Sequence, residues 1–258
     1  MSLFWELHSD LPREGPGADE TTRKAAEKIP RLPEGSRVLD VGCGPGAQTL
    51  VLAWQFPQAH ITAVDRHAPF LEELRRRARL SEVSSRIASL QGDMRALPFS
   101  DDRFDLIWSE GAVYIMGFEA GLRSWRPLLK ENGWVAVTEI SWLTGEPPDE
   151  PKEFWSRNYP AMATIASNCS MAQGAGYEVL HHFTIPERDW WTDYYGPLEM
   201  KMRALRLKYA DKRDALAFLD EEQKEIDLFR EHSPCYGYVF YLLRKESSPS
   251  GLKPRRSS

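Results

Sequence analysis

Short apolar runs alternate with amphipathic segments of helical period between about residue 34 and residue 142. The runs Val38-Leu39 and Leu106-Ile107-Trp108 are continuously apolar, as expected for strands buried on both sides. Between such runs, apolar residues recur at helical spacing, as at Leu71, Leu74 and Ala78. This alternation predicts an α/β fold, in which a mainly parallel sheet carries helices on both faces. The predicted strands are residues 37–42, 60–65, 86–93, 104–110 and 133–142, and the predicted helices are residues 46–55, 68–79 and 117–130.

The chain after Trp142 departs from this rhythm. A helix is expected at 151–165, a sixth strand at 177–185, and a last strand at 236–245. Two helices with apolar faces are expected between these last two strands. Before the first strand, an irregular segment of about twenty residues leads into a short helix at 21–29.

These elements predict a single domain over residues 1–245. Its core is expected at 34–142, and cap or lid elements are expected at 1–33 and 143–235. The remaining residues, 246–258, are rich in Ser, Pro and Arg and are expected to form a disordered tail.

Charge and cysteine content narrow the possible partners. The 258 residues carry a net charge of −5 without a basic stripe, so nucleic acid is not the expected partner. No apolar run approaches the roughly 20 residues that span a bilayer, so no membrane partner is expected. Three widely separated cysteines suit a reducing, cytoplasmic location, and no zinc spacing occurs, so no metal is expected. Both a monomer and a homodimer remain open.

A glycine-rich loop follows the first predicted strand and precedes a predicted helix. Its glycines, Gly42, Gly44 and Gly46, let backbone amides approach a ligand beyond the carboxyl end of the sheet. Asp65 ends the second strand, where a carboxylate can accept hydrogen bonds from both hydroxyls of a ribose. The glycine spacing also fits a dinucleotide fingerprint, so these features alone leave a nicotinamide cofactor open.

Three further acids at strand ends help to choose the ligand. Asp40 lies inside the end of the first strand, where it would repel a pyrophosphate but suits a ligand that carries an ammonium and a sulfonium. Asp93 follows the third strand and can accept the adenine amino group, while Met94 can pack on the ring. Glu110 follows the fourth strand at the same edge.

In combination, these motifs resemble the class I S-adenosylmethionine-dependent methyltransferases. The segments that carry the resemblance, beside the glycine loop and Asp65, are "QGDM" (91–94), "LPFSDDRFDLIWSEGAVYIM" (97–116) and "WRPLLKENGWVAVTE" (125–139). More closely, residues 34–142 are similar to small-molecule methyltransferases of the ubiquinone and menaquinone pathways. The resemblance implies a Rossmann-like, seven-stranded sheet of order 3-2-1-4-5-7-6 with an antiparallel strand 7, an added helical lid, and S-adenosyl-L-methionine as cofactor.

The resemblance also implies roles for individual residues. The loop from Asp40 to Gly46 would hold the methionine part, Asp65 the ribose, and Asp93 with Met94 the adenine. Glu110 would lie beside the sulfonium. The full implied cofactor set is Asp40, Gly42, Cys43, Gly44, Pro45, Gly46, Gln48, Asp65, Arg66, Gly92, Asp93, Met94, Glu110 and Gly111.

Methyl transfer requires alignment of a nucleophile with the methyl group and exclusion of water. A general base is needed only if the nucleophile must lose a proton, and the candidates are Glu110 and Tyr114, with His8 if the N-terminus folds over. Residues 142–200 are rich in aromatics, which predicts either a lid for a flat, apolar or cationic molecule or an ordinary core. The predicted lid residues are Trp142, Trp155, Trp190 and Tyr194.

The leading hypothesis is therefore an enzyme that methylates a small-molecule acceptor. Two alternatives remain: an oxidoreductase of the NAD type, and a non-catalytic protein that binds S-adenosylmethionine. An oxidoreductase would have no need of the acids at positions 40 and 93. The acceptor and the methylated atom stay open.

Overall fold

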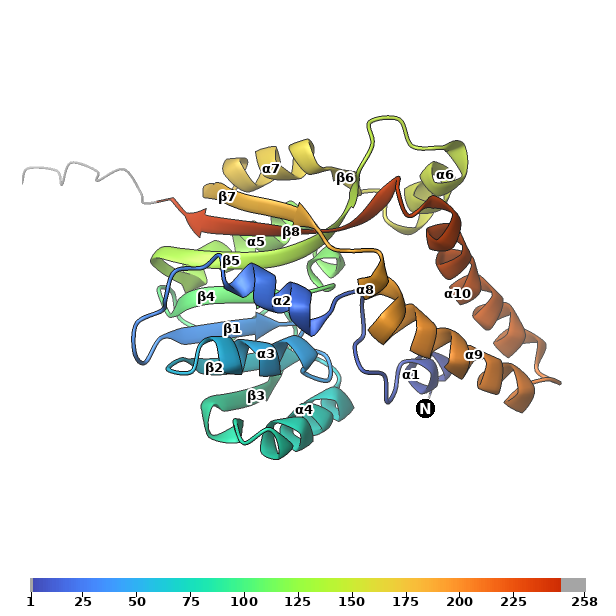
Figure 1. Ribbon diagram of the computed structural model, residues 1–258, viewed down its shortest axis with the longest axis horizontal. Coiled ribbons are helices and arrows are strands. Elements are labelled where there is room, and N and C mark those ends of the chain that lie inside the picture. The colour runs from blue at the N-terminus through green and yellow to red at the C-terminus, as the bar shows by residue number, and fades with distance from the viewer. Residues whose placement is uncertain (1, 247–258) are drawn as a thin grey trace, which may run out of the picture.

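A twisted sheet organises the computed structural model, which describes residues 2–246 (Figure 1). The order of the strands is β3-β2-β1-β4-β5-β8-β7, and the short β6 pairs with the end of β5. The five strands β1 to β5 are parallel, whereas β8 runs antiparallel between β5 and β7. The predicted order is confirmed, with β8 and β7 as the predicted strands 7 and 6. The bounds are β1 Arg37–Val41, β2 His60–Asp65, β3 Ile87–Gln91, β4 Phe104–Ser109, β5 Leu129–Trp142, β6 Ala163–Thr164, β7 Tyr177–Thr184 and β8 Tyr236–Lys245.

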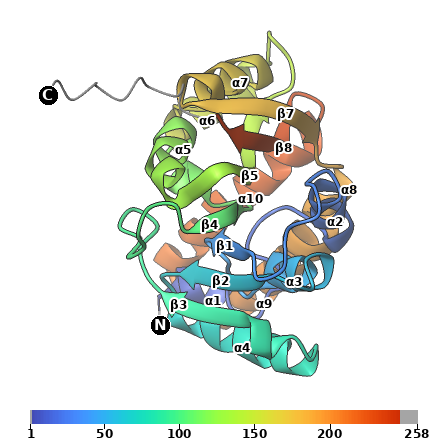
Figure 2. The same cartoon turned by 90° about the vertical axis from the view of Figure 1, so that its left-hand side faces the viewer.

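Both faces of the sheet are buried, because neighbouring residues of each central strand point into different cores. Val38 and Leu106 belong to the core beneath α2 (Asp19–Ala26) and α3 (Ala47–Gln55). Leu39 belongs to the core beneath α5 (Phe118–Trp125) and α7 (Ile165–Gly174), on the opposite face. Figure 2 views the sheet from its end, with α2 and α3 on the right and α5 on the left. The helix α4 (Ala68–Leu80) covers β2 and β3.

A group of helices lies beyond the carboxyl ends of the parallel strands, to the right of the sheet in Figure 1. We call this group the cap. It comprises α1 (Leu3–Leu7), α6 (Asp149–Asn158), α8 (Arg188–Trp190) with the π-helical turn η4 (Trp191–Tyr195), α9 (Gly196–Lys208) and α10 (Arg213–His232). No helix within residues 2–246 is both long and apolar enough to cross a membrane.

Two parts of the chain differ from the elements that the sequence predicts. The helix expected at 151–165 ends at Asn158, and β6 and the separate helix α7 follow it. The sequence of α7, "IASNCSMAQG", has small and weakly polar residues all round, so no apolar stripe announces it. A helix, α1, also forms inside the N-terminal stretch that was expected to be irregular. The expected disordered tail lies, apart from Glu246, outside the described residues.

The turn between β1 and α3 depends on the absence of a side chain at Gly46. Its φ is +89°, and a Cβ there would lie 2.2 Å from Cδ1 and 3.1 Å from Cβ of the buried Leu74 of α4. Gly35 also has a positive φ, of +73°, but nothing lies within 4 Å of where its Cβ would be. A residue with a Cβ would therefore have a strained backbone at both positions, but only at position 46 would its Cβ also collide with neighbouring atoms.

We expect Gly46→Ala to lower the free energy of unfolding by about 1–3 kcal/mol more than the matched control Gly35→Ala, because only the first substitution overpacks a core. Urea unfolding of the two variants and the parent measures the difference. Equal losses in the two variants would show that α4 moves freely away from the loop.

Candidate active site

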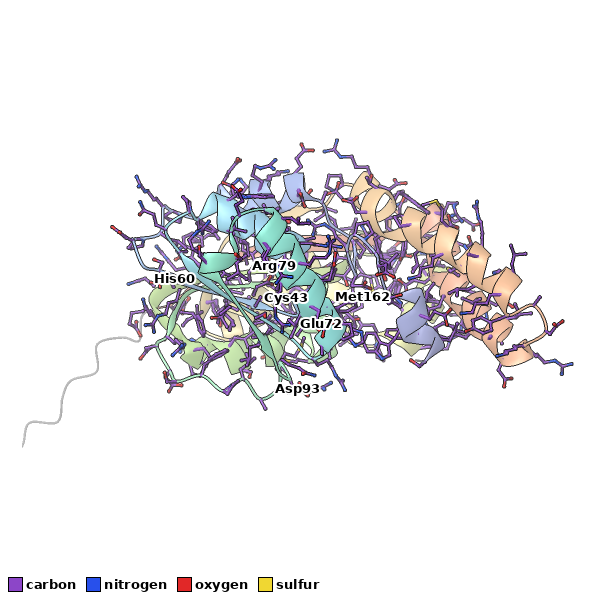
Figure 3. All side chains as sticks on the ribbon, turned by 90° about the horizontal axis from the view of Figure 1, so that it is seen from below. Cys43, His60, Glu72, Arg79, Asp93 and Met162 are labelled. Atoms are coloured by element: carbon purple, nitrogen blue, oxygen red, sulfur yellow. The ribbon has the colours of Figure 1, made fainter. Side chains whose placement is uncertain are left out.

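A cavity of about 450 Å³ lies where the parallel strands end and the cap begins. One half of its wall, the sheet half, comes from the glycine loop and from the ends of β2, β3 and β4. The other half, the cap half, comes from α1, α6, the α8–η4 turn, α10 and β8. In Figure 3, Cys43 and Asp93 mark the strand ends, and the cap helices extend away from them to the right.

The three loop glycines have three different surroundings, although all have positive φ. A Cβ at Gly42 would lie 2.4 Å from Cβ of Ala112, and Gly46 packs against α4, so both serve close packing. Only at Gly44 is there room, since the nearest atom to a Cβ would be Cγ of Glu14 at 3.7 Å. The backbone at Gly44 is therefore the part of the loop that a ligand can approach. Gly42, Cys43, Gly44 and Pro45 line the cavity, and Gly46 does not.

Asp65 is fixed at the edge of the cavity by the loop itself. Its Oδ2 accepts a hydrogen bond from Gly44 N at 2.9 Å, and its Oδ1 accepts one from His67 N at 2.8 Å. Burial raises the pKa of this carboxyl, while the two backbone donors oppose the rise. Each carboxylate oxygen has a second lone pair, so the predicted hydrogen bonds from ribose hydroxyls remain possible.

Asp40 does not reach the cavity. Its side chain is fully buried and accepts hydrogen bonds from Thr49 Oγ1 at 2.5 Å and Gln48 Nε2 at 3.3 Å. Burial raises its pKa to about 7. Asp40 thus ties the start of α3 to β1 and acts on the cavity through Gln48, which does line it. The sequence motif predicts an acidic residue at this position, but it does not show whether the side chain lines the cavity or is buried beneath the residues that do.

The predicted adenine residues form the open rim of the sheet half. Gly92, Asp93 and Met94 line the cavity, as does Arg66. Asp93 is exposed, and its Oδ1 accepts a hydrogen bond from Arg95 N at 2.9 Å. The side chain of Asp93 is therefore oriented by its own turn and remains accessible from the cavity.

Glu110 is a buried anchor for residues 8–22, here called the N-terminal segment. Its Oε1 accepts hydrogen bonds from Thr22 Oγ1 and Trp108 Nε1, both at 2.8 Å, and its Oε2 lies 3.2 Å from Arg13 Nη1. The side chains of Arg13 and Glu110 are each 5% exposed. Since both oxygens already have protein donors, Glu110 is better placed to hold the N-terminal segment over the cavity than to remove a proton. Gly111 beside it lines the cavity and donates its backbone N–H to Thr138.

The predicted lid residues divide into three groups. Trp155 and Tyr194 line the cap half, and Tyr114 joins them from the loop after β4. Trp190 also lines it, but its indole is 2% exposed and stacks on Phe229 with ring centroids 4.0 Å apart, so it is mainly a core residue. Trp142 is not brought to the cavity, because the β5 strand that carries it continues past the site and turns its ring toward Tyr236.

Several residues of the cap half were not among the individual site residues that the sequence predicts, although one of them, Tyr159, lies in the aromatic-rich stretch 142–200. Tyr159 is held by its hydroxyl, which donates to Oε1 of Glu139 at 2.6 Å, and burial raises the pKa of Glu139 to about 8. The other missed side chains are Phe4, Trp5, Glu14, Asn158, Glu222, Glu225 and Tyr238. The one available signal was in α10, where two acids lie at helical spacing beside the apolar Ile226 and Phe229.

A match to a known protein family covers the part of the chain that forms the sheet half of this cavity. Residues 38–133 match the family model described as "Methyltransferase domain", and the predicted resemblance to S-adenosylmethionine-dependent methyltransferases is confirmed. Among curated relatives, a malonyl-[acyl-carrier protein] O-methyltransferase of Xylella fastidiosa is 31% identical over 185 residues, covering 70% of this chain and 58% of that protein. A trans-aconitate 2-methyltransferase of Paracidovorax citrulli is 35% identical over 123 residues, which cover 46% of this chain and 45% of that protein.

The chain spans about half the length of the curated relatives it matches. Among solved structures, an S-adenosylmethionine-dependent methyltransferase of Geobacter sulfurreducens, in complex with S-adenosyl-L-homocysteine, aligns with a TM-score of 0.78 and 20% identity. The alignment covers 93% of this chain and 96% of that one. At this identity the likeness establishes the fold.

The raised pKa of Asp40 predicts a specific dependence of stability on pH. The unfolded carboxyl ionises near pH 4, whereas the folded one keeps its proton up to about pH 7. The folded state therefore binds more protons in this window, and the parent should lose stability as the pH rises from 4 to 7. Relative to Asp40→Asn, whose side chain does not titrate, we expect a loss of roughly 2–4 kcal/mol.

Urea unfolding of both proteins at pH 4, 5, 6 and 7 measures this difference. Asp101→Asn, at an exposed turn, is the matched control and should follow the parent at every pH. A difference between parent and Asp40→Asn that stays constant with pH would mean that the buried carboxyl titrates as in the unfolded chain.

Proposed function

We propose that this protein is an S-adenosylmethionine-dependent methyltransferase that acts on a small-molecule acceptor. The observation that carries the proposal is the convergence on one cavity of an accessible loop backbone at Gly44, a fixed carboxylate at Asp65, and the Asp93-Met94 pair. These are the chemical groups that a nucleoside with an amino-acid side chain requires. The methyltransferase-domain match over residues 38–133 supports the same reading.

The residues present fit the cofactor. In the proposal Asp65 accepts hydrogen bonds from the ribose, Asp93 accepts one from the adenine, and Met94 packs on the ring. The backbone at Gly44 and the side chain of Gln48 face the methionine part. Bound there, S-adenosylmethionine supplies a methyl group on a positively charged sulfur, and the acids of the sheet half suit that charge.

This chain's own contribution is alignment and exclusion of water. The N-terminal segment and the cap close over the strand ends, and aromatic side chains line the half that is left for an acceptor. We therefore propose that 34–142 hold the cofactor, and that 1–33 and 143–235 form the acceptor site within one domain. Tyr114 lines the cavity and is 44% exposed. Its phenol is protonated at neutral pH, as an ordinary tyrosine is, and acts as a hydrogen-bond donor toward the acceptor.

The proposal extends to the setting of the protein. A cytoplasmic location is supported by its cysteines, since Cys43, Cys169 and Cys235 are all free thiols. A net charge of −5 without a basic surface stripe supports a small molecule rather than nucleic acid as the partner. Both a monomer and a homodimer are compatible with these features.

We expect S-adenosylhomocysteine to bind the protein and raise its melting temperature, and NAD to leave it unchanged. Asp65→Ala should weaken the binding of S-adenosylhomocysteine by about tenfold to a hundredfold, because hydrogen bonds to a charged acceptor are worth roughly 1.5–3 kcal/mol. Isothermal calorimetry measures the affinity, with the exposed Asp101→Ala as control. No binding by the parent, or full binding by Asp65→Ala, would overturn the cofactor assignment.

A further inference from the structure

The cap half of the cavity contains more acids than bases. Two carboxylates of α10, Glu222 and Glu225, line it, and Glu14 of the N-terminal segment lies at its border with the sheet half, close to Gly44. His8 also lines the cavity, where its imidazole pairs with Glu14 and its charge lowers the pKa of Glu222 and Glu225.

Within residues 2–246, no lysine or arginine other than Arg13, Arg66 and Arg95 lines the cavity at all. Arg13 is held by Glu110 and Asp19, and the other two belong to the sheet half.

The carboxylates are also short of hydrogen-bond donors. Glu225 accepts one hydrogen bond, from Tyr195 at 2.8 Å, and no donor in the described part of the chain reaches Glu222. Glu14 contacts His8 through Oε2 at 3.0 Å, while its Oε1 is buried without a partner. Burial raises the pKa of all three carboxyls. Glu222 and Glu225 are half-buried, so water can reach them before a ligand binds. A ligand that displaces this water must supply the hydrogen-bond donors that the protein lacks there.

Aromatic rings form the remainder of the cap half. Tyr194 and Tyr114 lie close enough to Glu222 and Glu225 for the charge of each acid to affect both phenols. Further aromatic side chains complete the wall, namely Trp155, Tyr159, Trp190 and Tyr238. Aromatic faces attract organic cations, and acids beside them add hydrogen bonds and charge, whereas the same wall repels a carboxylate or a phosphate.

We propose that the methyl acceptor is an amine, recognised as its ammonium by Glu222, Glu225 and the aromatic wall of the cap half. This inference rests on the function proposed above. It separates this chain from its relatives that are named for trans-aconitate and malonyl-[acyl-carrier protein], because those acceptors are acids.

The same acids account for the proton that the reaction must move. The bound ammonium transfers one proton to the carboxylate of Glu222 or Glu225, which leaves a neutral amine with a free lone pair. The amine nitrogen then forms the new bond to the methyl carbon, while the carbon–sulfur bond breaks and its electron pair stays on sulfur. The positive charge passes to the methylated nitrogen, so atoms and charge balance. Burial raises the pKa of both carboxyls, which makes each ionised carboxylate a stronger base toward the bound ammonium.

A matched set of ligands tests the inference on the parent protein. Benzylamine, benzyl alcohol and benzoate carry the same ring with a cation, a neutral group and an anion. Calorimetry on the preformed complex with S-adenosylhomocysteine should give benzylamine at least about tenfold higher affinity than either of the others. Measuring binding rather than turnover keeps this question apart from the chemistry.

Single variants then assign the recognition to named acids. Glu222→Gln and Glu225→Gln should each weaken benzylamine binding by about tenfold and leave the affinity for S-adenosylhomocysteine within about threefold. The control is Glu221→Gln, next in sequence, whose exposed carboxylate pairs with Lys224 and should change neither affinity.

The outcomes separate the two proposals. If S-adenosylhomocysteine does not bind the parent, the proposed function fails. If it binds, but benzylamine binds no better than benzoate and benzyl alcohol or not at all, the amine inference is overturned and the methyltransferase function stands. This comparison on the parent decides the matter even where a variant fails to fold.

Discussion

The ion pair between Glu110 and Arg13 joins the two parts of the molecule on which the active site depends. Glu110 extends from the end of β4, so the central sheet fixes its position, while Arg13 lies in a segment with little regular structure. A buried carboxylate without donors would be costly, and the N-terminal segment supplies two of its three donors. The need to satisfy one carboxylate thus holds a long irregular stretch of backbone across the cavity.

Three acidic side chains gather at this edge of the sheet. Asp40, Asp65 and Glu110 lie near one another at the carboxyl ends of adjacent strands, and burial raises the pKa of each. The structure tolerates them by different means: neutral donors for Asp40, backbone amides for Asp65, and an arginine for Glu110. Among the acids that line the cavity, those of the cap half have the fewest hydrogen-bond donors from the protein. A bound substrate can supply the donors that are lacking there.

The sequence was sufficient for the sheet because its signals are local. Continuous apolar runs and strand-end acids depend only on neighbouring positions, so β1 to β5 could be predicted, together with several residues that line the cavity at the ends of β2, β3 and β4. The helix α7 could not, because its small, weakly polar residues pack under α5 and β7 without an apolar stripe. The cap half could not either, since residues as far apart in the sequence as Phe4 and Glu225 come to line one cavity only through the tertiary fold. For Asp40 and Gly46, the motif predicted a place in the binding site. Only the packing showed that these two residues support the loop from behind and do not line the cavity.

The path of the N-terminal segment also has a consequence for synthesis of the protein on the ribosome. Residues 8–22 are synthesised before their partners, which come much later in the chain: Glu110 after β4, Asp189 in α8 and Lys201 in α9. The nascent sheet can begin to assemble while this segment still lacks the groups that hold it. The segment can dock only after most of the chain has been translated, so the cavity is enclosed near the end of folding. Until then, the N-terminal segment remains accessible to chaperones and proteases.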